Sequence, residues 1–131
     1  MEVVTERGDG VVVVRVSGRI DGSNFAAFDA AVSAAIEDDD CDVLMDLKAI
    51  SYIGTTGLRT FARVARKLRG AATLAICAVP DQTRRVFEIT GFDRVIPMFP
   101  SRAEALAFLA RERSSRGRGD VATADVQQEC P

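Results

Sequence analysis

The sequence contains no histidine, and this absence removes several classes of function at once. Histidine is the commonest general base and the commonest metal ligand, and most serine and cysteine catalytic triads are built on its imidazole ring. The three cysteines also lack the CxxC spacing of a zinc site. Hydrolase chemistry and a metal centre are therefore not expected, and we predict a binding protein without enzymatic activity.

Long apolar runs and nucleotide-binding motifs are missing as well. No segment approaches the roughly 20 apolar residues that span a bilayer, and residues 1–9 are polar without the pattern of a signal peptide. Neither GxxxxGK[ST] nor GxGxxG occurs, so no cofactor is predicted. The net charge of -2 favours no class of partner. These features predict a cytoplasmic protein that does not insert into membranes.

Length and composition predict one globular domain and a short tail. A chain of 131 residues, of which 47% are hydrophobic and 27% charged, can build one ordinary core. We place this domain at residues 1–112. Residues 113–131 are rich in Ser, Gly, Arg and Asp, so a disordered C-terminal tail is expected. The arginines around its start are Arg111, Arg113, Arg116 and Arg118. No aromatic residues are interleaved with them, which argues against direct binding of nucleic acid.

Apolar periodicity predicts alternating strands and helices. A β-branched run at 11–16 can pair with Val3 and Val4 through a glycine-rich turn, and further strands are expected at 43–47, 72–79 and 95–98. Apolar spacings of three and four predict helices from Phe25, after the turn at 54–57 and at 83–90, and a capping box at Ser101 opens a last helix. The order predicts an α/β fold with a mixed sheet of about five strands and about four helices.

The turn before the second helix reads Gly54-Thr55-Thr56-Gly57. Threonine at a helix start commonly caps the helix, because its hydroxyl accepts a hydrogen bond from a backbone N–H. The two glycines permit close backbone approach and leave the hydroxyls accessible, and a helix N-terminus tolerates a phosphate. The turn therefore has two interpretations: a helix cap, or a phosphorylation site whose added charge would act on a docked partner.

Four segments resemble the STAS domain of the bacterial anti-sigma-factor antagonists: VVVRVSGRID at 12–21, VLMDLKAISYIGTTGL at 43–58, AICAV at 75–79 and RVFEITGFDRVI at 85–96. The most specific part of the family pattern is a strand followed by Asp-Ser-Ser-Gly-Leu, which reads Gly-Thr-Thr-Gly-Leu at 54–58 here. The resemblance implies a single STAS-like domain. It also implies a partner that is both anti-sigma factor and serine/threonine kinase, and a phosphatase that resets the switch.

Carried over to this sequence, the resemblance makes Thr55 and Thr56 the candidate phosphoacceptors. Candidate partner-binding residues lie in the same turn and in the segment after the first long strand: Asp21, Ser23, Gly54, Gly57, Leu58 and Arg59. Two positions depart from the family pattern. Threonine replaces serine, and Gly54 replaces an aspartate that could orient the hydroxyl or engage the partner. A homodimer is left open.

Two alternatives follow from these departures and from the order of elements. One is a STAS subunit of a signalling scaffold or of a lipid ABC transporter, which binds its partner without being phosphorylated. The other is a phosphotransfer receiver domain with Asp46 as its acceptor, but residues 18–21 supply no acidic pair and neither lysine is placed for that role. We expect Asp46 to have a hydrogen-bonded structural role.

Overall fold

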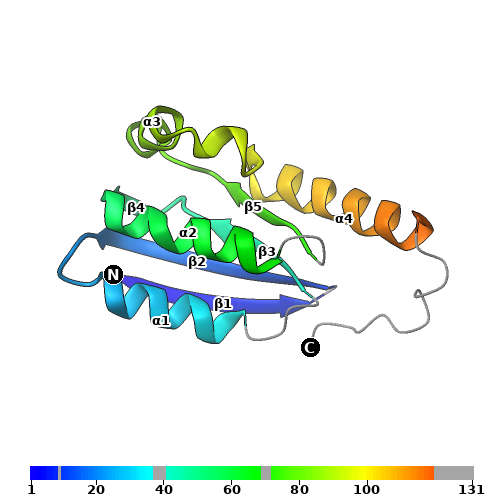
Figure 1. Cartoon of the computed structure of the whole chain (residues 1–131), viewed down its shortest axis with the longest axis horizontal. Helices are drawn as coiled ribbons and strands as arrows, with labels where there is room; N and C mark the ends of the chain where they lie inside the picture. The colour runs from blue at the N-terminus through cyan, green and yellow to red at the C-terminus, as the bar shows by residue number, and fades with distance from the viewer. Residues whose placement is uncertain (9, 37–40, 69–71, 120–131) are drawn as a thin grey trace.

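The computed structural model describes residues 1–8, 10–36, 41–68 and 72–119. Within these residues, strands and helices alternate along an α/β chain (Figure 1). The strands are β1 (Glu2–Gly8), β2 (Val11–Ile20), β3 (Asp42–Asp46), β4 (Ile50–Ile53), β5 (Leu74–Cys77) and β6 (Met98–Phe99). The helices are α1 (Phe25–Ala35), α2 (Thr55–Leu68), α3 (Asp81–Thr90) and α4 (Arg102–Gly119), with a short 3-10 helix, η1, at Phe92–Arg94.

The strands form one mixed sheet of six strands, in the order β1-β2-β3-β5-β6. Strands β1 and β2 are antiparallel, and every later pairing is parallel because a helix or loop carries the chain back to the same edge. Strand β4 lies outside this order and pairs with the last residues of β2, beyond the end of β3. The predicted mixed sheet is confirmed, with β4 as an additional short strand.

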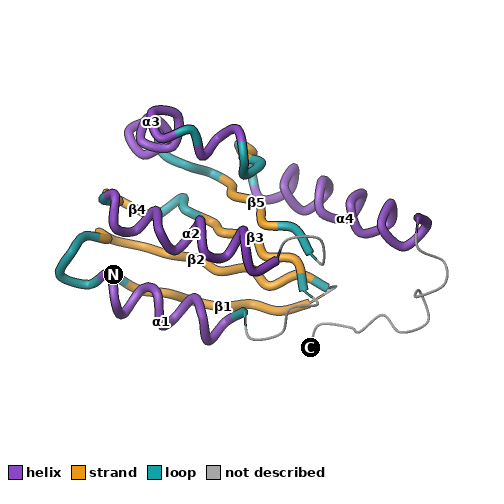
Figure 2. The backbone as a smooth tube through the Cα atoms, in the orientation of Figure 1, coloured by secondary structure: helices purple, strands orange, loops and turns teal. Residues whose placement is uncertain are grey.

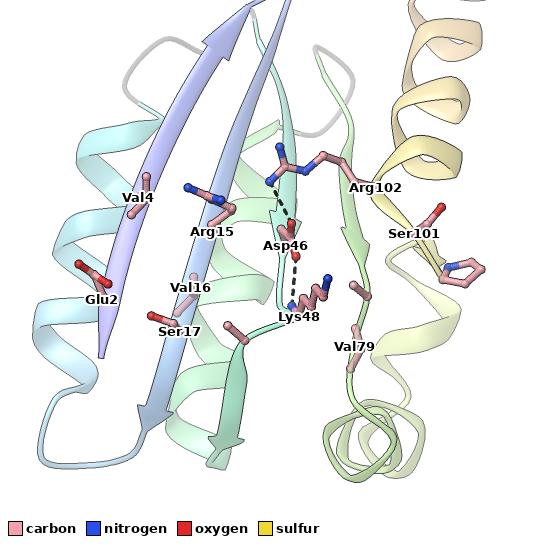
Figure 3. A pocket seen from close by; sticks show the side chains of 13 residues that line it. Glu2, Val4, Arg15, Val16, Ser17, Asp46, Lys48, Val79, Ser101 and Arg102 are labelled. Atoms are coloured by element: carbon pink, nitrogen blue, oxygen red, sulfur yellow. Dashed lines mark hydrogen bonds and ion pairs between the residues drawn. The ribbon is translucent and has the colours of Figure 1, made fainter.

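Helices cover the two faces of the sheet unequally. Helices α1, α2 and α3 bury one face over the larger core, in which Phe61 packs at 6.1 Å from Phe28 and 5.4 Å from Phe87 between ring centroids. Helix α4 covers only part of the other face, through Ala105 and Leu109. Figure 3 shows this second face with α4 along one side and the C-terminal half of β2 uncovered.

Gly57 sets how closely α2 approaches the sheet. A Cβ atom at this position would lie 2.8 Å from Ile53 Cγ1 and 3.1 Å from Ile20 Cγ2, closer than carbon atoms approach without movement. Both isoleucines are buried in the core and have little room to move. Glycine is therefore required here by packing, and it fixes where the first turn of α2 lies.

The C-terminal half differs from the expected strand at residues 95–98. Val95 does not belong to an edge strand: Gly91 has a φ of 82°, the chain turns there into η1, and Val95 is 70% exposed. The predicted domain boundary at residue 112 falls inside a helix. Helix α4 runs to Gly119, and the Arg113 guanidinium donates to the Gly10 carbonyl at 3.2 Å. The remainder of the predicted tail, residues 120–131, lies outside the described residues.

Candidate partner-binding surface

The C-terminal ends of β2 and β4 lie side by side and bring the two predicted site segments together. Arg19 pairs with Tyr52 and Ile20 with Ile53 in parallel register. The Gly54 amide then donates to the Ile20 carbonyl at 2.9 Å, so the chain leaves both strands at one edge. Figure 2 shows the loop after β2 and the start of α2 at the same end of the molecule. Partners of parallel sheets commonly bind at this edge.

Asp21 is held in place by short hydrogen bonds within its own loop. Its carboxylate accepts from the Ser23 hydroxyl at 2.6 Å, the Ser23 amide at 2.9 Å and Arg19 Nε at 2.8 Å. These bonds, the Ser23 hydroxyl first, lower the pKa of Asp21 to about 2. Asp21 therefore presents a fixed negative charge at neutral pH, and Ser23 acts by orienting it.

Asn24 stabilises the same loop. Asn24 occupies the N-cap position of α1 without a side-chain bond to the helix. Its amide group donates instead to the Arg19 carbonyl at 2.7 Å, and its Oδ1 accepts from the Asp21 amide at 3.0 Å. The loop between β2 and α1 is therefore closed by side-chain bonds that keep Asp21 at the sheet edge.

Arg19 and Tyr52 form a contact that the sequence analysis missed. The Arg19 guanidinium carbon lies 4.2 Å from the centroid of the Tyr52 ring, within the range of a cation–π contact. Both side chains are open to solvent, with 61% exposure for the Arg19 side chain and 42% for Tyr52. Side chains two residues apart share a strand face. Arg19 lies two residues before the predicted site residue Asp21, and Tyr52 lies two residues before Gly54, so this spacing was the signal in the sequence that could have indicated the contact.

Thr55 and Thr56 are the first two residues of α2. Thr55 is exposed and Thr56 is partly buried, and in the described part of the chain neither hydroxyl has a hydrogen-bond partner. The predicted capping bond is therefore absent, because Gly54 and not a threonine precedes the helix. Arg59 is exposed one turn further along. The Thr55 hydroxyl is free to react or to contact a partner.

Gly57 and Leu58 do not belong to the accessible surface. Gly57 is buried on the sheet-facing side of the first turn of α2, and Leu58 is 3% exposed within the core. Both lie on the helix face that packs against the sheet, and their contact with a partner stays a prediction. The surface that remains consists of Arg19, Asp21, Ser23, Tyr52, Gly54, Thr55 and Arg59. We call it the β2–α2 surface.

Comparison with known proteins identifies the family of the chain. A family model described as the STAS domain matches residues 2–105. The chain belongs to the STAS family of anti-sigma-factor antagonists. These proteins are regulators without enzymatic activity, which agrees with the prediction made from the missing histidine.

Relatives of the STAS chain cover nearly its whole folded part. It is 31% identical to the putative anti-sigma factor antagonist BtrV of Bordetella bronchiseptica over 82% of this chain and 93% of the relative. A solved anti-sigma factor antagonist from Mycobacterium paratuberculosis is 32% identical, with a TM-score of 0.77 over 83% of this chain and 93% of that one. Bacillus SpoIIAA, solved in its phosphorylated form, shares the fold at 19% sequence identity and a TM-score of 0.62. The match covers 81% of this chain and 97% of SpoIIAA.

The sheet face that α4 partly covers carries a groove of about 860 Å³ (Figure 3). Arg102 crosses it from the start of α4 to reach Asp46 at 3.0 Å and Glu6 at 3.4 Å, and Glu6 also pairs with Arg15 at 3.3 Å. The second Asp46 oxygen accepts from the Lys48 amide at 3.1 Å. The hydrogen-bonded structural role predicted for Asp46 is confirmed. Its carboxylate pairs with Arg102 and so holds the start of α4 against the sheet.

Two structural features are absent from the described residues: a membrane-spanning helix and a metal-ligand cluster. None of the helices in these ranges is long and apolar enough to cross a membrane. In the same part of the chain, no cluster of three or more histidine, cysteine, aspartate or glutamate side chains is placed to hold a metal ion.

Proposed function

We propose that this STAS protein binds an anti-sigma factor through the β2–α2 surface, and that phosphorylation of Thr55 ends the binding. The observation that carries the proposal is the exposed Thr55 hydroxyl, without a hydrogen-bond partner in the described residues, at the start of α2 and next to the loop that fixes Asp21. The partner is expected to be a serine/threonine kinase as well as an anti-sigma factor, and both would act in the cytoplasm.

The chemistry required at Thr55 is a simple phosphoryl transfer. The γ-phosphoryl group of ATP would move to Thr55 Oγ1, the hydroxyl would lose its proton, and ADP would leave. The first amides of α2 have no partner within the helix and tolerate the anion, so the fold need not change. The added charge of about -1.5 to -2 would then act on the docked partner by repulsion and by the cost of desolvating the phosphate. A phosphatase would reverse the change.

The two departures from the family pattern are compatible with this mechanism. A Cβ atom at Gly54 would lie 3.5 Å from the Tyr52 hydroxyl, an ordinary contact, so glycine is not required there by packing. Asp21 supplies a fixed carboxylate on the adjacent loop. Threonine keeps the reactive hydroxyl, and the open surroundings of Thr55 accommodate its methyl group. Thr56 is the second candidate acceptor, although it is less accessible.

Incubation with the cognate kinase and ATP tests the proposal. We expect one phosphate per chain on Thr55 by mass spectrometry, and its loss in Thr55→Ala with no transfer to Thr56. The exposed Thr5 on β1 serves as an internal control that should remain unmodified. A chain that stays unmodified at both Thr55 and Thr56 would contradict the switch.

A second candidate is favoured by Gly54, since a STAS protein that is never phosphorylated has no need of the family's aspartate. It would bind constitutively, as part of a signalling scaffold or a lipid ABC transporter. Affinity purification from the native host separates the candidates. Recovery of a transporter ATPase or scaffold protein, with no anti-sigma factor, would support this second function.

A further inference from the structure

Two exposed arginines lie on elements that meet at the edge where α2 begins. Arg19 stands at the end of β2, and Arg59 lies four residues after Thr55 on α2. Neither is a member of a buried ion-pair network, and within the described ranges Arg59 has no hydrogen bond or ion pair. Arginine presents several donors in a planar fork that matches phosphate oxygens. Both guanidinium groups therefore have N–H donors that lack an acceptor in the described residues.

Arg19 is held loosely enough to change partners. Only its Nε donates to Asp21, so both terminal nitrogens lack a hydrogen-bond acceptor in the described residues. The rest of its contact is the face of Tyr52. A Cβ atom built at Gly54 would lie 3.5 Å from the Tyr52 hydroxyl, so the Tyr52 side chain extends from the Arg19 contact toward the residue before Thr55.

Arg59 reaches Thr55 along the helix itself. Residues four apart on an α-helix lie on the same face, about 5 to 6 Å between their Cβ atoms. A phosphate on Thr55 and the Arg59 guanidinium would therefore meet directly above the first turn. Arg66 is equally exposed but lies two turns further along α2, too far to make this contact.

We propose that Arg19 and Arg59 form an intramolecular clamp for a phosphate on Thr55. In this clamp Arg59 pairs with the phosphate along α2, while Arg19 leaves the Tyr52 ring and exchanges its bond to Asp21 for the more highly charged phosphate. The inference rests on Thr55 being the modified residue. It deepens the proposed switch, because the modification would rearrange the β2–α2 surface as well as add charge to it.

The clamp predicts a specific change in what the partner encounters. Before modification, Arg19, Tyr52 and Asp21 present a cation on an aromatic ring beside a carboxylate, the kind of side chains that dominate protein interfaces. After modification both arginines are neutralised within the chain, Tyr52 loses its cation, and Asp21 keeps only its bonds to Ser23. A partner that relies on Arg19 or Arg59 would then lose those contacts.

The experiment uses the full chain with phosphothreonine placed at position 55 during translation, so that no kinase is needed. A 31P NMR titration measures the second pKa of the phosphate, ordinarily about 6, in the parent, R19Q, R59Q and R66Q. We expect this pKa to rise by about half a unit or more in R19Q and in R59Q, as expected for loss of one nearby unit charge. R66Q is the matched control and should equal the parent.

Tyr52 provides a second readout, because it is the single tyrosine of a chain without tryptophan. Its fluorescence should differ between the unmodified and phosphorylated parent, and this difference should disappear in R19Q. Equal phosphate pKa values in R19Q and the parent, or a fluorescence change that persists in R19Q, would overturn the clamp. Failure of the kinase reaction would contradict the proposed function instead, and it would leave the result of the titration unaffected.

Discussion

Asp21 shows how a single side chain can be held in one orientation by its own loop. Its carboxylate is exposed enough to meet a partner, yet three short hydrogen bonds from Ser23 and Arg19 hold it in one orientation. A preorganised charge loses little entropy when a partner docks. At this scale the resemblance made Asp21 a candidate, while the bonds that orient it depend on the close turn at 21–24 and could not be read from the sequence.

The acid titration of Asp21 gives a prediction at the residue scale. Its pKa lies at about 2 in the folded chain, below the ordinary 3.8, so the folded state favours the ionised form. This contribution to stability is fully present above about pH 4 and is lost as the pH falls toward 2. NMR titration of the Asp21 carboxyl carbon should show its pKa rising in Ser23→Ala. An unchanged pKa would contradict the leading role assigned to the Ser23 hydroxyl.

At the scale of elements, the approach of α2 to the sheet decides where Thr55 stands. Periodicity predicted α2 and its buried stripe correctly, and Leu58 belongs to that stripe. The Arg19–Tyr52 contact could not be predicted in the same way, since it depends on β4 pairing with β2 in one register. A short strand such as β4 carries too little pattern to fix its partner from sequence.

Gly57→Ala tests the packing of α2. Alanine would by itself favour a helix over glycine by about 1 kcal/mol, but its Cβ would collide with Ile53 and Ile20. We therefore expect a net loss of about 1 to 3 kcal/mol in the free energy of unfolding, measured by urea denaturation. Gly22→Ala is the matched control, because no atom lies within 4 Å of its added Cβ. A Gly57→Ala protein as stable as the parent would show that α2 can move away from the sheet.

On the scale of the whole molecule, the two faces of the sheet are covered differently. Three helices bury one face, and the edge where β2 and β4 end carries the candidate surface. The other face is partly covered by α4, which is tied to the sheet by Arg102 and Arg113. The order of elements predicted this architecture, whereas the full length of α4 did not follow from its polar, glycine-containing end.

The binding of the cognate anti-sigma factor tests the central claim most directly. Its Kd should be measured by titration calorimetry for the unmodified chain and for chains carrying phosphothreonine at position 55 or, as a control, at the exposed position 5. Like charges and desolvation at the interface predict at least a tenfold weaker Kd for phosphate at position 55 and an unchanged Kd for phosphate at position 5. Equal affinity of all three proteins would contradict the account.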